Sequence, residues 1–224
     1  MATKNENVVV SIKPLEEKKV NIRIVGLTPL ITHSWSEKAR REMLDKQMKK
    51  TVTKARAAKD PFDDFIQSLY WLEGKPEEST PEAFQKAIEN GARFGFKVGA
   101  VKMAANSAAF RAGWVKNQMG LRGAYFLDAG DGEFFEIKDA TTGKPCIPIM
   151  REDNVKIAGG TADLRYRGEF QNWAADFVLS YDVNGEFSLE QILNCIHHGG
   201  YSVGIGEWRP ERDGEFGRYG IEGI

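Results

Sequence analysis

The chain has 224 residues, of which 42% are hydrophobic and 28% charged, as is typical of a globular protein with a sizeable core. Its 31 Lys and Arg balance 32 Asp and Glu to a net charge of −1, which excludes a uniformly basic nucleic-acid binder but allows a basic face. No run of about 18 apolar residues and no signal-peptide core occur, so we expect a cytoplasmic protein without a membrane span.

The N-terminal third predicts a strand followed by a basic excursion. Residues 18–33 alternate apolar side chains such as Ile22 and Ile24 with polar ones, which predicts a half-buried strand. Residues 36–60 hold nine Lys or Arg against four Asp or Glu, a surplus of five positive charges. Their narrow apolar stripe predicts a helix that packs only lightly on the body. We therefore assign residues 34–82 as an inserted basic helical arm and loop.

The middle of the chain predicts a helix and several strands. Residues 96–115 are rich in Ala and Gly, which predicts a helix packed closely on a sheet, and residues 123–139 predict two short strands around a glycine turn. Residues 141–162 contain Gly and Pro and indicate a long connection. Residues 162–170 and 173–182 then alternate clearly and predict a pair of strands.

The C-terminal part predicts a helix, a flexible loop and a final strand. Ser188 is a typical N-cap for a helix over 188–200, with Gly199 at its end. The loop that follows is rich in Gly and Arg, and the tail after it predicts an edge strand. Without its insertions, this order is compatible with a βαββαβ ferredoxin-like core. We predict an α+β fold in which residues 1–224 form a single domain.

Metal, disulfide and cofactor sites are not expected. The two cysteines, Cys146 and Cys195, lie far apart and outside any metal-ligand spacing, which fits a reducing compartment. The chain carries neither a phosphate-binding GK[ST] loop nor a dinucleotide fingerprint.

Two stretches resemble a known family. Gly204-x-Gly206 followed by Gly214-x-x-Gly217-Arg218, between the last helix and the last strand, resembles the glycine-rich loop of the RAMP superfamily, the RNA-binding subunits and processing nucleases of CRISPR systems. "VNIRIVGLTPLITHSW" also resembles the opening strand of the backbone subunit of that superfamily. "GTADLRYRGEF", "GEWRPE" and the Ala-rich helix are similar to proteins of bacteriophages and prophages.

The resemblance implies an RRM-like domain that binds single-stranded RNA or DNA without catalysis, assembles head-to-tail into an oligomer and acts in the bacterial cytoplasm. Arginine forks suit phosphate oxygens and aromatic rings stack on bases, with Trp35 and Tyr166 as further stacking candidates. The predicted contact residues are Lys38, Arg40, Arg41, Lys46, Lys49, Lys50, Lys97, Lys102, Arg111, Arg165, Arg167, Gly204, Gly206, Trp208, Arg209, Arg212, Gly217 and Arg218.

Three alternatives stay open. The charged segments can be solvated faces, and Arg165 and Arg167 can pair with carboxylates of a neighbouring strand. His33 follows the first strand, where processing nucleases of the resembled superfamily often carry a histidine general acid, so a metal-independent ribonuclease is a second candidate. A phage assembly factor that uses its Arg and Trp side chains on protein partners is the third.

Overall fold

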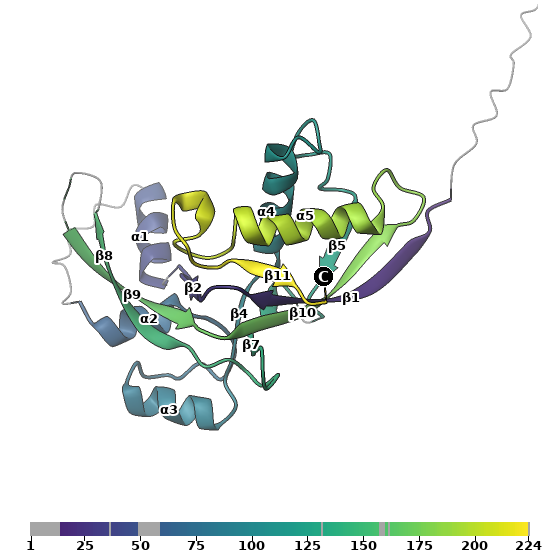
Figure 1. Ribbon diagram of the computed structural model, residues 1–224. Helices are drawn as coiled ribbons and strands as arrows, with labels where there is room; N and C mark the ends of the chain where they lie inside the picture. The colour runs from purple at the N-terminus through teal and green to yellow at the C-terminus, as the bar shows by residue number, and fades with distance from the viewer. Residues whose placement is uncertain are drawn as a thin grey trace, which may run out of the picture.

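The computed structural model describes residues 14–35, 37–48, 59–130, 132–156, 160 and 162–223 (Figure 1). They form a mixed α+β fold with antiparallel sheets. None of the described helices has the length and apolar character needed to cross a membrane.

The strands, in chain order, are β1 (Glu17–Gly26), β2 (Leu30–Thr32), β3 (Tyr70–Glu73), β4 (Arg93–Lys97), β5 (Tyr125–Asp128), β6 (Phe134–Glu136), β7 (Lys138–Asp139), β8 (Ile149–Lys156), β9 (Ala162–Phe170), β10 (Trp173–Asp182) and β11 (Tyr219–Ile221). The helices are α1 (Glu37–Gln47), α2 (Pro61–Ser68), α3 (Pro81–Glu89), α4 (Val98–Arg111) and α5 (Leu189–Ser202), with a 3-10 turn at Pro210–Arg212.

The central sheet has the strand order β11-β1-β10-β5, and each strand is antiparallel to its neighbour. Helix α4 precedes β5, α5 connects β10 to β11, and both helices lie on one side of this sheet (Figure 1). The alternation predicted for the first strand is confirmed, because Ile22 and Ile24 are buried while Arg23 between them pairs with Asp176 of β10 at 3.2 Å. The predicted edge strand at the C-terminal end is β11.

Small residues let α4 and α5 pack closely. Ala104, Ala105 and Ala108 of α4 are buried, and a Cβ atom on Gly199 of α5 would lie 2.6 Å from the backbone nitrogen of Ala105. Ser188 caps α5 as predicted, in a reciprocal capping box with Gln191. The prediction that the helix ends at Gly199 was wrong: it continues to Ser202, and Gly199 is instead the point of close contact with α4.

Two smaller sheets, β2-β9-β8 and β3-β4-β6, complete the fold. Strands β9 and β10 are confirmed as strands, but they do not pair with each other. Between them the chain turns a corner at Gln171 and Asn172 and passes from one sheet to the next. The two short strands predicted within 123–139 likewise belong to different sheets, since β5 pairs with β10 and β6 with β4.

The segment 34–82 is only partly the lightly packed arm that the sequence indicated. Phe65 of α2 and Trp71 of β3 pack edge-to-face on Phe84 of α3, at centroid distances of 5.3 and 6.1 Å, and Phe65 is fully buried. The part from α2 onward therefore belongs to the core. Helix α1 fits the original expectation better, because its apolar residues Met43 and Leu44 are exposed.

The expectation of a long connection over 141–162 was wrong, because this range contains β8, which pairs along its whole length with β9. The strand could not be recognised from its sequence, because the side chains that face inward include Arg151 and Asp153 and therefore give no apolar alternation.

Candidate nucleic-acid interface

The glycine-rich segment 203–218 is an ordered loop, held by backbone hydrogen bonds to the chain around β2. The amide of Glu207 donates to the carbonyl of Ile31 at 2.9 Å, and the amide of Gly217 donates to the carbonyl of Pro29 at 2.8 Å. The loop also closes on itself, from the amide of Ile205 to the carbonyl of Gly217 at 2.9 Å. The expectation of a flexible loop was therefore wrong.

Two of the predicted phosphate-binding glycines have a packing role. Gly206 has a φ of +77° and Gly217 a φ of +66°, in the left-handed region that favours glycine. A Cβ atom added to Gly206 would lie 2.4 Å from the carbonyl oxygen of Ile31. A Cβ atom added to Gly217 would lie 1.8 Å from the carbonyl oxygen of Ile205. Gly204 is buried and also has a positive φ. Loop closure explains these glycines without a ligand.

Arg209 and Arg111 are held by an internal carboxylate. Arg209 donates to Glu211 at 2.9 Å and to the Gly206 carbonyl at 3.0 Å, and Arg111 of α4 reaches the other Glu211 oxygen at 2.9 Å. Burial raises the pKa of Glu211, but the hydrogen bond and charge of Arg209, aided by Arg111 and Ser107, outweigh it, so this pKa lies below its ordinary value. Much of the positive charge of both arginines is thus neutralised locally.

Three other side chains of the loop are the remaining candidates for contact with a nucleic acid. Trp208 is 38% exposed and has a φ of +51°. The Arg218 guanidinium lies 4.4 Å from the ring centre of Tyr201 and 4.0 Å from Glu215. Arg212 is exposed and makes no ion pair within the described part of the chain. The loop therefore presents Arg212 and an indole to solvent, whereas the side chain of Arg218 is 24% exposed.

Arg167 of β9 is not available to a phosphate, contrary to the prediction, because its side chain is only 2% exposed. It lies 3.1 Å from Asp153 of β8 and 3.5 Å from Glu207 of the loop. The alternative of cross-strand ion pairing therefore holds for this residue. Its Nε atom is buried and has no hydrogen-bond partner among the described residues.

Arg151 extends this ion-pair network. It donates to Asp153 at 2.8 Å and to Glu169 at 2.7 Å, while its guanidinium lies 4.5 Å from the ring centre of Phe216. Burial lowers its pKa, but the hydrogen bonds and charges of Glu169 and Asp153 raise it above the ordinary value. The network fastens the C-terminal loop onto the β8–β9 strands.

His33, the weak catalytic candidate, lies at the edge of the same network. Its Nδ1 atom is 3.9 Å from Glu207, and its backbone carbonyl accepts a hydrogen bond from the Tyr70 hydroxyl at 3.2 Å. Burial and the charge of Arg167 lower the pKa of His33, and the carboxylate of Glu207 opposes them. Burial, followed by the charge of Glu207, raises the pKa of Tyr70.

The remaining predicted cations are spread over the molecule. Arg165 is partly exposed, 3.9 Å from Asp163, and Arg40 and Arg41 are exposed on α1. Lys38 and Lys46 belong to α1, but their side chains are outside the description, and Lys49 and Lys50 lie outside the described residues.

Two lysines lie apart, on the other side of the fold. Lys97 is exposed at the start of α4, and Lys102 donates to the Tyr125 carbonyl at 2.8 Å and lies over the ring of Phe126. Burial lowers the pKa of Lys102. The continuous phosphate track predicted from the sequence is therefore divided.

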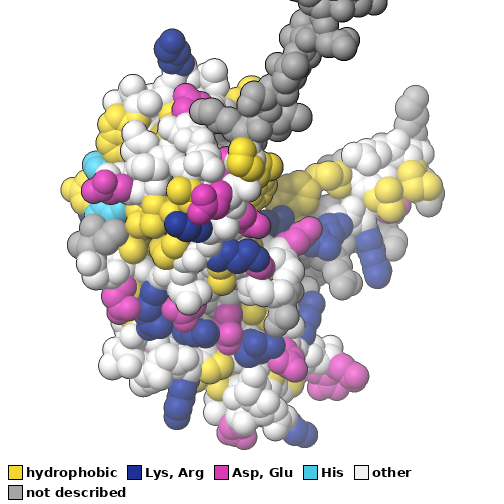
Figure 2. All heavy atoms as spheres, turned by 90° about the vertical axis from the view of Figure 1, so that its right-hand side faces the viewer, with side chains coloured by type: hydrophobic (Ala, Val, Ile, Leu, Met, Phe, Trp, Pro, Cys, Tyr) yellow, Lys and Arg dark blue, Asp and Glu magenta, His cyan; other side chains and the backbone are white. Residues whose placement is uncertain are grey.

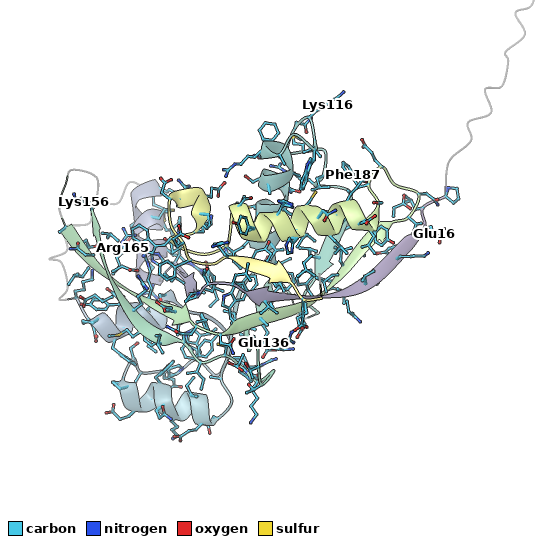
Figure 3. The ribbon with its side chains drawn as sticks, viewed as in Figure 1. Glu16, Lys116, Glu136, Lys156, Arg165 and Phe187 are labelled. Atoms are coloured by element: carbon cyan, nitrogen blue, oxygen red, sulfur yellow. The ribbon has the colours of Figure 1, made fainter. Side chains whose placement is uncertain are left out.

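Of the two further stacking candidates, Trp35 is exposed after β2, whereas Tyr166 points to the face of β9 opposite Arg165 and Arg167. Figure 3 places Arg165 and Lys156 at one end of the molecule, far from Glu16 and Phe187 at the other.

Sequence reasoning missed Glu207, which joins His33, Arg167 and the loop. Only its position directly after Gly206 could have drawn attention to it. Asp153 was missed because its strand was not predicted.

No protein-family model matches the chain, and no curated protein is significantly similar to it.

Proposed function

We propose that this chain is a RAMP-like, cytoplasmic, single-stranded nucleic-acid-binding protein of phage or mobile-element type. It binds RNA or DNA without catalysis and its copies associate head-to-tail along the strand. The binding face consists of the loop 203–218, the outer end of the β8–β9 strands and α1.

The order of the elements supports this proposal. When β2 to β4 and β6 to β9 are set aside, β1, α4, β5, β10, α5 and β11 follow the order βαββαβ. Their sheet order, β11-β1-β10-β5, is the one that a ferredoxin-like split unit gives, with the last strand beside the first. The glycine-rich loop lies between the last helix and the last strand, as in the resembled superfamily.

The observation that carries the proposal is that a hydrogen-bonded loop exposes Trp208 and Arg212 and leaves Arg218 partly exposed. An ordered loop pays little conformational entropy on binding. Stacking on Trp208 would contribute about 1–3 kcal/mol per base with little sequence preference, and the arginines would bind phosphate. Because Arg167 and Arg209 are held by carboxylates and largely buried, the proposed contacts are fewer than the sequence suggested: the exposed Arg212 and Arg40, and the partly exposed Arg165 and Arg218.

Fluorescence anisotropy with labelled oligo-dT and oligo-U at two salt concentrations tests the proposal. We expect affinity to fall with salt, with a logarithmic slope of about −0.7 per phosphate contact. Trp208→Ala should weaken binding at least about fivefold, and Arg212→Ala should also reduce the salt slope. The control is Lys18→Ala, which removes one charge next to Glu16 at the opposite end (Figure 3). Absence of binding at low salt, or equal loss in the control, contradicts the proposal.

Head-to-tail association has its own test. A heterologous contact that does not close produces a filament. Micrographs of the pure protein with and without a long oligonucleotide should show filaments that depend on the nucleic acid. Discrete closed rings or monomers in both samples contradict this part of the proposal.

The 3.9 Å approach of His33 to Glu207 favours a second function, metal-independent RNA cleavage. In this reaction the 2′-hydroxyl attacks the adjacent phosphorus and gives its proton to water, the bond from phosphorus to the 5′-oxygen breaks, and an imidazolium protonates that departing oxygen, leaving a 2′,3′-cyclic phosphate. The charge of Glu207 favours the protonated imidazole that this step needs, but burial and Arg167 outweigh it and lower the pKa of His33. Both side chains are partly exposed, so a phosphodiester can approach them.

Gel analysis of RNA in the presence of EDTA tests this second function. Cleavage should be lost in His33→Ala, reduced in Glu207→Gln and absent on the all-deoxy analogue. Wild-type activity of His33→Ala would remove His33 from the reaction.

A further inference from the structure

We propose that copies of this chain join by one specific contact, in which helix α1 of one copy docks on a groove at the opposite end of the next copy. The contact rests on the head-to-tail association proposed above and gives it two defined surfaces. Figure 1 shows α1 at the end of the molecule that carries β8 and β9, and Figure 3 labels Glu16 and Phe187 at the other end, beside the groove.

The groove exposes apolar side chains. It has a volume of about 680 Å³ and is lined by the start of β1, the residues around the start of β5, the end of β10 and the β10–α5 connection. Leu15 and Phe126, two of its apolar residues, are 84% and 61% exposed. Figure 2 views the molecule from this end and shows hydrophobic side chains next to acidic ones. Apolar side chains that lie together on a hollowed surface indicate contact with another molecule.

The groove is also acidic. Glu17, Asp182 and Glu186 line it, and among the described residues no Lys or Arg does. The Asp182 carboxylate accepts hydrogen bonds from the amides of Glu16 and Asn184. Glu17 and Glu186, in contrast, form no ion pair within the described part of the chain. A suitable occupant therefore combines apolar side chains with a positive charge.

Helix α1 has a face of this kind. Five exposed residues recur at the i, i+3, i+4, i+7 and i+8 spacing that brings side chains onto one face of a helix, namely Arg40, Met43, Leu44, Gln47 and Met48. The amide of Met48 donates to the carbonyl of Leu44 at 2.9 Å, so the helical turn extends to Met48. The face is about 12 Å long. An apolar stripe with this spacing normally packs on another element, but here it is exposed.

The two surfaces complement each other. The apolar side chains of α1 would cover Leu15 and Phe126, while Arg40 would meet Glu17 or Glu186. Two groove ends would repel each other by like charge, and so would two α1 faces that each carry Arg40. We therefore assign the occupant of the groove to α1 of a second copy in a head-to-tail contact rather than in a symmetric pair.

The position of the two surfaces determines how the assembly grows. Because they lie at opposite ends of the molecule, each contact leaves one α1 face and one groove free for further copies, which produces an open series. At every junction Arg40 would meet carboxylates rather than phosphate. Arg212, Arg165 and Arg218 then remain for the nucleic acid.

Disulfide trapping between two variants tests the contact. Leu44→Cys places a thiol on α1, and Gly123→Cys places one in the groove, where a Cβ atom meets nothing within 4 Å. The native Cys146 and Cys195 are buried and do not compete. Oxidation of an equimolar mixture, with and without a long oligo-dT, should give crosslinked dimers that neither variant gives alone. Leu27→Cys, 57% exposed against 54% for Leu44, should give at least about tenfold less dimer with Gly123→Cys.

Absence of dimers from the mixture would overturn the contact. Dimers of Leu44→Cys alone would also overturn it, because two α1 faces would then meet each other. The result is separate from that of nucleic-acid binding. Filaments on oligo-dT without the crosslink would overturn this contact and support the proposed function. The crosslink without any binding of oligo-dT or oligo-U would support this contact and contradict the proposed function.

Charge exchange gives a second test that does not depend on thiols. Arg40→Glu places like charges at the junction, and so does Glu17→Arg/Glu186→Arg, so each variant alone should self-associate at least about tenfold more weakly than the wild type. An equimolar mixture of the two variants should recover the association, because every junction between unlike copies joins opposite charges. Light scattering measures this. A loss that persists in the mixture would overturn the pairing of Arg40 with this groove.

Discussion

Arg167 of β9 and Asp153 of β8 form an ion pair of 3.1 Å in which both side chains are almost wholly buried, at 2% and 7% exposure. Two strands thus carry charge on the face where most strands carry apolar side chains. Glu207 and Arg151 extend the pair to the loop and to Glu169. The consequence is that this part of the fold depends on charge balance.

Arg167→Met should therefore destabilise the protein strongly. It leaves the buried carboxylate of Asp153 with one fewer partner, and breaking such a pair costs about 3–5 kcal/mol. Arg165→Met, two residues away on the same face of β9, removes an exposed cation and should change the free energy of unfolding by less than about 0.5 kcal/mol. Urea denaturation of both variants checks this, and similar values for the two would contradict the role of burial.

His33 should make stability depend on pH. Because burial and Arg167 lower its pKa in the folded protein, the unfolded chain binds the proton more readily. The stabilisation from neutral His33 is fully present above the unfolded pKa of about 6.5 and is lost as the pH falls toward the folded pKa. His33→Gln should thus lose less unfolding free energy between pH 7 and pH 5 than the wild type. Parallel pH profiles would refute this.

Gly217 should tolerate no side chain. In Gly217→Ala the new Cβ atom would meet the Ile205 carbonyl oxygen at 1.8 Å, so the loop must open. Gly143 has a similar φ, +69° against +66°, but open space around it. Gly143→Ala should cost about 1 kcal/mol from the backbone alone, and Gly217→Ala should cost clearly more. Thermal unfolding compares the two, and equal losses would mean that the loop adapts.

The two thiols should be inert in the folded protein. Burial raises the pKa of Cys195 to about 11, and burial with the charge of Asp139 raises that of Cys146 to about 11. At pH 8 only about one thiol in a thousand is then ionised, and the thiolate is the reactive form. An aromatic disulfide reagent should label two thiols per chain in urea and almost none without it. Rapid labelling of the native protein would show that a cysteine is accessible.

The parts of the fold that follow simple rules could be predicted from the sequence. The alternation around Ile22 and Ile24, the cap at Ser188 and the strand 173–182 each follow from local pattern. Strand β8 could not be predicted, because periodicity methods look for apolar alternation and its inward side chains are charged. Nor could the sequence say that β9 and β10 part at a corner, since sheet membership is a long-range property.

The candidate site was predicted less well than the fold. Arg212 and Trp208 are exposed, in keeping with the expected surface, and Arg218 is partly exposed. Arg167 and Arg209 are instead held by the carboxylates of Asp153 and Glu211. A count of charges along the chain cannot distinguish these cases, because it contains no information on partners. The glycines suggested flexibility, but they allow close backbone packing instead.

The corner between β9 and β10 acts as a fixed joint between two halves of the protein. Gln171 bonds to Glu169 at 2.7 Å, Asn172 bonds to Asp139 at 3.0 Å, and the next residue, Trp173, is fully buried. The angle between the part that carries the loop and the part that carries the start of β1 is thus the same in every copy. If copies join in series through one repeated contact, each would add the same rise and the same rotation, because this joint presents both contact surfaces at the same angle in every copy.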